Sequence, residues 1–279
     1  MKVIKILNNN ALLAIDNDGE EYVYLANGIG FANKINTQFK PIEDQKRYKL
    51  SSDDKKTKDI EEIDSKYIEI SSKILSIAEV RFKEVDEKIL LPLADHIAFA
   101  IERIQKNMDI VNPFKTEIQL LFPEEFEVAK KGSELISQQT GIEINEDEVS
   151  YITLHIHSAI SSEHVSLSMQ IIQAMNKFIK ELEAKFNLEI SNTSLAYARF
   201  TTHMRYMVAR IHRGEHLDLD MDEYTKERFP VSYENAKNLI NRIGELMKCN
   251  IDTVEIGYLA LHIERITKSE NKKLNSNNE

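Results

Sequence analysis

The sequence is poor in cysteine, glycine and proline, and it has no tryptophan. Cys249 is the single cysteine, so no disulfide can form within the chain and no cysteine cluster can bind zinc. Eight glycines and five prolines in 279 residues, with 42% hydrophobic and 29% charged residues, are typical of a helix-rich globular protein rather than a fibrous or disordered one. The missing tryptophan excludes nothing.

Long hydrophobic runs are also missing. No stretch reaches the ~18 consecutive apolar residues of a membrane-spanning helix, and the N-terminus meets Asn8-Asn9-Asn10 before an apolar signal region can develop. We therefore expect a cytoplasmic protein that is neither exported nor inserted in a membrane, in agreement with the single cysteine.

Acidic residues outnumber basic ones, and the excess is unevenly placed. The net charge is −10, but residues 1–50 hold seven Lys/Arg and six Asp/Glu, so the rest of the chain carries −11. Only the N-terminal part tolerates a polyanion electrostatically, and even there charge alone gives weak support for nucleic-acid binding.

The first fifty residues show the pattern of short strands. Residues 3–7, 11–15, 21–25 and 48–50 are rich in β-branched, aromatic and aliphatic side chains, and Asp16-Asn17-Asp18-Gly19 favours a tight hairpin turn. The polar residues 51–62 predict a linker. Helical periodicity follows to about Lys268, and the Asn-, Lys- and Ser-rich end predicts a frayed tail.

The helical part repeats itself at an offset of 107 residues. His96 falls on His203 and His155 falls on His262 without a gap. Other matched pairs are Arg103 and Arg210, Phe122 and Phe229, Pro123 and Pro230, Glu148 and Glu255, and Tyr151 and Tyr258. The predicted fold class is therefore a small antiparallel β-sheet domain, residues 1–58, followed by two all-α helical-bundle domains, residues 63–166 and 167–279.

The duplicated histidines are the main candidates for chemistry. Residues three and seven apart share a helix face, which groups His96 with Phe99 and Arg103. His203, Tyr206 and Arg210 repeat that trio, and a second trio, Glu148, Tyr151 and His155, recurs as Glu255, Tyr258 and His262. A hydroxyl and a carboxylate beside the second histidine can fix its tautomer and leave one nitrogen free as a nucleophile.

Two plainer interpretations compete. A single histidine on a helix flank is usually a buried residue held by hydrogen bonds, although four in a duplicated register weaken that interpretation. Metal binding is prompted by His155-Ile156-His157 and by Asp95-His96. In the other copy His157 is replaced by Glu264, and Asp95 by Thr202. Because no repeated set supplies three or four ligands, we expect no metal and no cofactor.

In the N-terminal part, Asn8-Asn9-Asn10 and Gly28-Ile29-Gly30-Phe31 stand out. Side-chain amides can read base edges, glycines allow close backbone approach, and an exposed aromatic ring can stack on an unpaired base. Taken alone, these residues favour ordinary turn chemistry with Phe31 in the core.

These motifs resemble a known family. Leu7-Asn8-Asn9-Asn10 and Gly28-Ile29-Gly30-Phe31 are similar to the co-antiterminator RNA-binding domain of the BglG/SacY transcription antiterminators. The duplicated part is similar to that family's two PTS-regulation domains through Asp95-His96-Ile97-Ala98-Phe99-Ala100-Ile101-Glu102-Arg103, Leu154-His155-Ile156, Thr202-His203-Met204-Arg205-Tyr206 and Leu261-His262-Ile263. The resemblance covers nearly the whole chain, and the order of the domains agrees.

The resemblance implies an RNA-binding homodimer rather than an enzyme. Such a protein binds a hairpin in a nascent messenger RNA leader and prevents a terminator from forming. Carried over by motif, the RNA contacts are Lys5, Asn8, Asn10, Asn27, Gly28 and Phe31. Many members have a basic residue where this chain has Asn27, so Lys5 or Lys34 would have to supply the phosphate contact there.

The resemblance also implies phosphorylation of His96, His155, His203 and His262 by the sugar phosphotransferase system. In such members a sugar-specific enzyme II acts on the first helical domain and inhibits, and the carrier HPr acts on the second and often activates. A phosphoryl group adds about −1.5 to −2 charges, enough to remodel a helical dimer interface. The spacing of Arg103 and Arg210, rather than the resemblance, suggests that they stabilise the incoming group.

Two other hypotheses remain open. One is a histidine phosphocarrier or metal-binding helical enzyme. The other is a regulator whose N-terminal domain binds DNA, which is disfavoured because residues 1–50 have no helix-turn-helix pattern.

Overall fold

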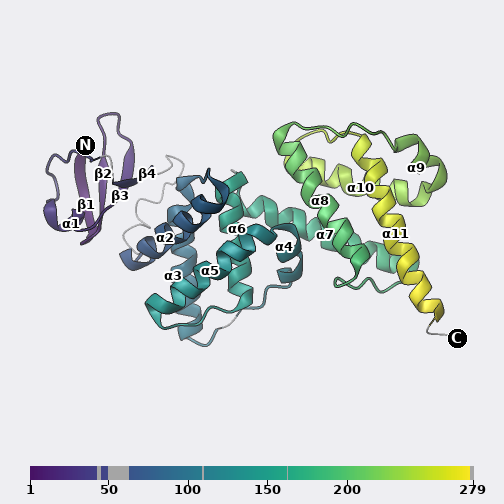
Figure 1. Ribbon diagram of the computed structural model, residues 1–279, viewed down its shortest axis with the longest axis horizontal. Helices are drawn as coiled ribbons and strands as arrows, with labels where there is room; N and C mark the ends of the chain where they lie inside the picture. The colour runs from purple at the N-terminus through teal and green to yellow at the C-terminus, as the bar shows by residue number, and fades with distance from the viewer. Residues whose placement is uncertain (43–44, 50–62, 109, 162, 277–279) are drawn as a thin grey trace. The chain divides into compact units, whose positions relative to one another are not determined.

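The N-terminal module is an antiparallel sheet. The computed structural model describes residues 1–42, 45–49, 63–108, 110–161 and 163–276. Over these residues the sheet has four strands in the order β1 (Lys2–Asn8), β2 (Ala11–Ile15), β3 (Glu21–Leu25) and β4 (Lys46–Lys49) (Figure 1). The second and third strands match the prediction, and the first is one residue longer at each end. The last begins two residues earlier than predicted, and Leu50 and the predicted linker at residues 51–62 lie outside the described residues.

The predicted hairpin turn is confirmed. The Asp16 carboxylate oxygen Oδ1 accepts hydrogen bonds from the backbone N–H groups of Asp18 and Glu20, both at 2.9 Å. Gly19 has φ +87°, a left-handed conformation in which a Cβ would be strained. The turn therefore satisfies its own backbone and fixes the pairing of β2 with β3.

The two faces of the sheet pack differently. Leu12 and Tyr24 belong to a cluster that includes Phe39. Side chains of the opposite face, such as Val23 and Tyr48, are buried with residues of α2 (Ser65–Phe82). The Tyr48 hydroxyl lies 2.7 Å from the hydroxyl of Ser72, so the contact with α2 is hydrogen-bonded as well as apolar.

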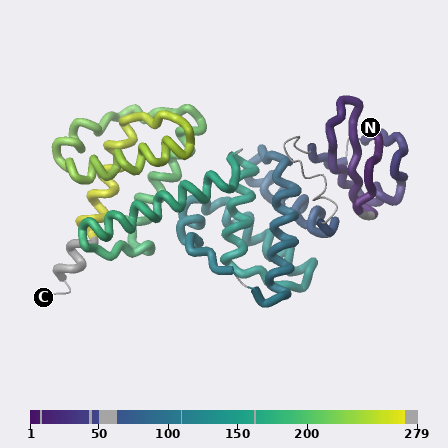
Figure 2. Tube along the Cα trace, turned by 180° about the vertical axis from the view of Figure 1, so that it is seen from behind, coloured from purple at the N-terminus to yellow at the C-terminus, as the bar shows by residue number. Residues whose placement is uncertain are grey.

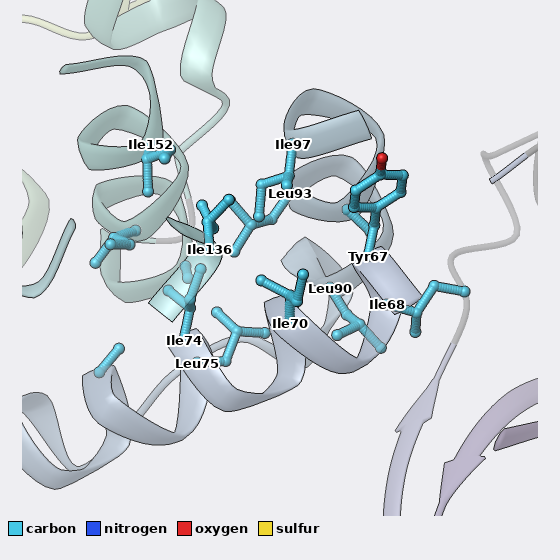
Figure 3. Close-up of a cluster of buried hydrophobic side chains, with 14 of the residues drawn as sticks. Tyr67, Ile68, Ile70, Ile74, Leu75, Leu90, Leu93, Ile97, Ile136 and Ile152 are labelled. Carbon is cyan, nitrogen blue, oxygen red and sulfur yellow. The ribbon is translucent and has the colours of Figure 1, made fainter. Parts of the chain in front are cut away.

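The first helical bundle belongs to the same compact unit, which holds residues 1–112 and 124–162. It contains α2, the short η2 (Glu87–Ile89), α3 (Leu90–Gln105), α5 (Pro123–Thr140) and α6 (Glu146–Ser161). Figure 3 shows how aliphatic side chains such as Ile74, Leu93 and Ile152 converge between these helices. Leu93, Ile97 and Ala100 form an apolar stripe along α3 that is fully buried, and this burial fixes which face of α3 carries His96.

The second unit holds residues 113–123 and 163–279. Its helices are α4 (Lys115–Leu121), α7 (Val165–Phe186), α8 (Leu195–Arg213), α9 (Asp222–Arg228), α10 (Pro230–Met247) and α11 (Val254–Ser276), and the chain can be followed from α7 to α11 in Figure 2. The predicted frayed tail is wrong over residues 268–276, because no glycine or proline interrupts the helix there and α11 continues. No helix within the described ranges is long and apolar enough to cross a membrane.

Helices α4 and α9 occupy equivalent places in the repeat but pack differently. α9 packs on α11 and α10, whereas α4 packs on α8. The contact of α4 includes a buried hydrogen bond of 2.7 Å, in which the Tyr197 hydroxyl donates to Glu117 Oε1. The repeat offset alone does not predict this difference.

Candidate functional site

Helices α3 and α6 bring the first two predicted histidines together. The ring centroids of His96 and His155 are 5.0 Å apart, with a tilt of 36°. The side chain of His96 is 15% exposed. The rings therefore sit at the edge of the core, where burial and access from solvent are both possible.

A carboxylate links the first histidine to an arginine. Glu148 Oε2 lies 3.5 Å from His96 Nε2, and Glu148 Oε1 accepts a hydrogen bond of 2.8 Å from Arg103. The sequence pattern predicted that this carboxylate lies beside His155, which is seven residues further along the same helix. That expectation is wrong, because seven residues span about 10 Å of helix and the neighbouring α3 brings His96 closer.

The second copy repeats this geometry between α8 and α11. The rings of His203 and His262 are 4.9 Å apart, and Glu255 Oε2 lies 3.5 Å from His203 Nε2. Arg210 donates from Nε and Nη2 to the two carboxylate oxygens of Glu255, both at 2.8 Å. The same four-residue arrangement is thus built twice, with a bidentate ion pair in the second copy.

Burial keeps the imidazole rings uncharged. Desolvation, reinforced by His155 and Arg103, lowers the pKa of His96 to about 3. Desolvation alone lowers the pKa of His155 to about 4. In the second copy the pKa of His203 falls to about 3 and that of His262 to about 4, again mainly through desolvation. A neutral imidazole keeps a lone pair on one nitrogen, which is the state that a phosphoryl acceptor needs.

The four aromatic residues grouped with the histidines differ in position. Tyr151 and Tyr258 contact a histidine ring, whereas Phe99 and Tyr206 are largely exposed. Tyr151 lies 5.9 Å from the His96 ring, and Tyr258 stacks on His203 at 6.3 Å. Phe99 and Tyr206 are 56% and 54% exposed. Tyr206 nevertheless lines one cavity with His203 and Arg210, as the grouping predicted. The grouping of His96 with Phe99 stays a prediction.

A cavity opens beside the second histidine pair. Its volume is about 370 Å³, and both His203 and His262 line it, together with Arg199, Arg210 and Tyr258. A space of this size is larger than a phosphoryl group.

The surroundings of His157 bear on the metal-binding interpretation. The Nδ1 atom of His157 lies 3.0 Å from Glu125 Oε1. Among the residues that the structure describes, no three His, Cys, Asp or Glu side chains come together as a metal site.

The candidate RNA-contact residues surround a short loop after β3. Asn10 Oδ1 accepts a hydrogen bond of 2.9 Å from the backbone N–H of Gly28, which adopts φ +72° before α1 (Ile29–Ala32). Phe31 on α1 is 85% exposed. The expectation that Phe31 lies in the core is wrong, because the left-handed Gly28 turns the chain so that Ile29 is buried in its place.

The other predicted contacts lie near the loop in sequence. Asn27 is exposed beside Gly28, and Lys5 is half-buried on β1. Asn8 ends that strand. Sequence reasoning missed the role of Asn10 in shaping the Gly28 loop, although its amide side chain in an Asn-rich turn is a signal for such a contact.

Comparisons with known proteins match this architecture. A family described as "CAT RNA binding domain" matches residues 1–57, and a family described as "PRD domain" matches residues 68–159 and 176–266. Transcription antiterminator LicT of Bacillus subtilis (strain 168) is 30% identical over 275 residues, covering 96% of this chain and 99% of that protein. Protein GlcT of Staphylococcus aureus (strain bovine RF122 / ET3-1) is 32% identical over 285 residues, covering 96% and 98%.

A solved structure agrees over the N-terminal half. The crystal structure of GlcT CAT-PRDI is similar with a TM-score of 0.50 and 36% identity, and the match covers 57% of this chain and 97% of that one.

Proposed function

Since the chain belongs to the family of transcription antiterminators that join a CAT RNA-binding domain to two PRD domains, we propose that it binds a hairpin in a nascent messenger RNA leader and prevents a terminator from forming. As a member of that family it is an RNA-binding regulator with PTS-regulated domains rather than an enzyme. We further propose that it acts in the cytoplasm, where nascent RNA and phosphocarriers meet, as a homodimer.

One observation carries the RNA proposal. Phe31 is 85% exposed on a short helix that the Asn10–Gly28 hydrogen bond positions. Exposure of a large apolar ring to water is unfavourable, and such a ring is a suitable platform on which an unpaired base can stack. Asn27 and Gly28 offer an amide and a close backbone approach beside it, and Lys5, Lys34 and Asn8 supply further polar contacts in the proposal.

The test compares two exposed apolar residues. In the full chain, Phe31→Ala should weaken binding to a hairpin with internal loops by about 1–3 kcal/mol without changing the thermal unfolding midpoint. Ile42→Ala, at a residue that is 67% exposed, should change neither quantity. Equal binding of wild type and Phe31→Ala, or equal affinity for an uninterrupted duplex, would reject the proposal.

The histidine pairs are proposed as the regulatory phosphorylation sites. Four neutral imidazoles in two repeated arrangements suit acceptance of phosphoryl groups from carrier proteins. We propose that a sugar-specific enzyme II phosphorylates His96 and His155 and opposes activity, and that HPr phosphorylates His203 and His262 and supports it. Each new phosphoryl group would add about −1.5 to −2 charges to a buried ring edge.

A reporter for transcriptional read-through tests these roles. The His96→Ala/His155→Ala variant should be active with and without inducing sugar, whereas His203→Ala/His262→Ala should be weakly active in both conditions. Dimer content by sedimentation should follow the read-through. If the first variant stays inducer-dependent while folded, the assignment of inhibition to the first pair fails even if RNA binding survives.

A further inference from the structure

The two histidine pairs differ in the cations around them. Arg199 lies one turn before His203 on α8, and Arg265 lies one turn after His262 on α11. At the repeat offset of 107 residues the first copy has Pro92 and Ser158 at these places. The second pair therefore has two positive charges that the first pair lacks.

Arg199 lines the cavity that contains the second pair, and Arg265 lines an adjoining cavity that neither histidine lines. Arg199 lines the cavity of about 370 Å³ that contains His203 and His262. It also lines a second cavity of about 690 Å³, to which Arg265 and Lys268 contribute. Arg199 is thus common to both spaces, and a charged group on His262 would lie within the field of both guanidinium groups.

These guanidinium groups remain available for a ligand. Both side chains are exposed, and neither has an ion pair or hydrogen bond within the described part of the chain. By contrast, the guanidinium groups of Arg210 and Arg103 are held by the carboxylates of Glu255 and Glu148. After desolvation, the positive charges of Arg265 and Arg199 lower the pKa of His262 further.

We propose that Arg199 and Arg265 form an anion-binding subsite that makes the second histidine pair the faster and longer-lived phosphoryl acceptor. The proposal rests on the proposed function of the histidines and adds a reason why the two copies respond differently. Exposed guanidinium groups can donate paired hydrogen bonds to the oxygens of a phosphoryl group, both during transfer and afterwards.

The transfer step involves the accessible nitrogen of His262. Its Nδ1 atom is buried without a hydrogen-bond partner among the described residues, so Nε2 is the nitrogen that can meet a donor in the cavity. With phosphoramidate as the donor, a bond forms between Nε2 and phosphorus while the phosphorus–nitrogen bond of the donor breaks. Ammonia leaves with the electron pair and takes up the proton that the ring releases. The arginines would neutralise charge on the phosphoryl oxygens throughout.

The experiment uses the full chain and phosphoramidate, with phosphohistidine at each site followed by mass spectrometry. In wild type, the second pair should gain phosphate about ten times faster than the first, since a charge-assisted contact is worth roughly that factor. Arg199→Met/Arg265→Met should remove this advantage and shorten the lifetime of phosphohistidine at His262. Arg199→Lys/Arg265→Lys should keep most of it, because the charge remains.

The matched control is Arg213→Met/Arg228→Met, which removes two arginines from the ends of α8 and α9 and should leave the rate unchanged. The rate at His96 and His155 in the Arg199→Met/Arg265→Met variant should also stay unchanged, which a general loss of folding would not allow. An unaltered second-pair rate in that variant would overturn the subsite while leaving phosphorylation intact. Absence of phosphate at all four histidines, from phosphoramidate and from carrier proteins, would overturn the proposed function as well.

Discussion

Gly257 on α11 lies against the backbone of Met221, where a Cβ atom at residue 257 would come within 2.8 Å of the Met221 carbonyl carbon. The residue equivalent to Gly257 in the first copy is Ser150, on α6. A serine Cβ is incompatible with such an approach. This single difference gives a steric reason why α9 packs on α11 while its counterpart α4 packs on α8 instead.

A methyl group at residue 257 should therefore displace α9. Gly257→Ala gains helix propensity of about 1 kcal/mol, but overpacking against backbone costs about 1–3 kcal/mol, so we expect a net loss of stability in urea unfolding. The control is Gly132→Ala on α5, where the atoms nearest to the new Cβ belong to the Ile74 side chain at 3.2 Å. It should cost less, because a side chain can shift more readily than backbone. Gly257→Ala as stable as wild type would refute this explanation of the packing.

Local patterns predicted much of the fold. Alternation and turn residues located β2 and β3, and the 107-residue repeat located both histidine pairs. The motifs predicted the family, the fold class and the antiterminator function, and these three predictions are confirmed. The domain limits at residues 58, 63, 166 and 167 stay predictions, and the placement of α4 shows how packing departs from chain order.

The contacts between helices could not be predicted from the sequence. The spacing of Glu148 and His155 on one helix says nothing of the crossing of α3 and α6, which sets the 3.5 Å approach of Glu148 to His96. Exposure of Phe31 likewise depends on a positive φ at Gly28, which composition allows but does not require.

The buried contact of α4 leads to a second prediction. Tyr197→Phe removes a hydroxyl that donates to Glu117 Oε1 and leaves a buried carboxylate without that hydrogen bond. We expect a loss of about 1–3 kcal/mol in the free energy of unfolding. Removing both polar groups together, in Tyr197→Phe/Glu117→Leu, should cost less than the sum of the single changes. Tyr206→Phe, at an exposed tyrosine of the same helix, should be neutral.

The carboxylate beside His96 leads to a third prediction. Glu148→Gln leaves Arg103 with a weaker partner in a partly buried place, and we expect a loss of about 1–3 kcal/mol in the free energy of unfolding. The control Glu127→Gln breaks an exposed pair with Lys130, for which we expect a change below about 0.5 kcal/mol. Equal effects of the two variants in urea unfolding would contradict a structural role for the Glu148 pair.

The four buried histidines lead to a prediction for pH. Their folded pKa values are about 3 for His96 and His203, and about 4 for His155 and His262, whereas an unfolded histidine has a pKa of about 6.5. Between these limits the unfolded chain binds protons that the native protein excludes. The stabilisation is therefore fully present above about pH 6.5 and is lost progressively as the pH falls toward 4.

Urea unfolding at pH 7.0 and 5.5 measures this loss. Each buried histidine should contribute roughly 1 kcal/mol of lost stability over that interval, and His203→Asn/His262→Asn should remove about half of the pH dependence. His216→Asn replaces a histidine whose side chain is 74% exposed and should remove none of it. If stability instead stayed constant from pH 7.0 to 5.5, the native protein would have to bind the same protons as the unfolded chain. The imidazoles would then be charged in the folded state, and their role as neutral phosphoryl acceptors would need revision.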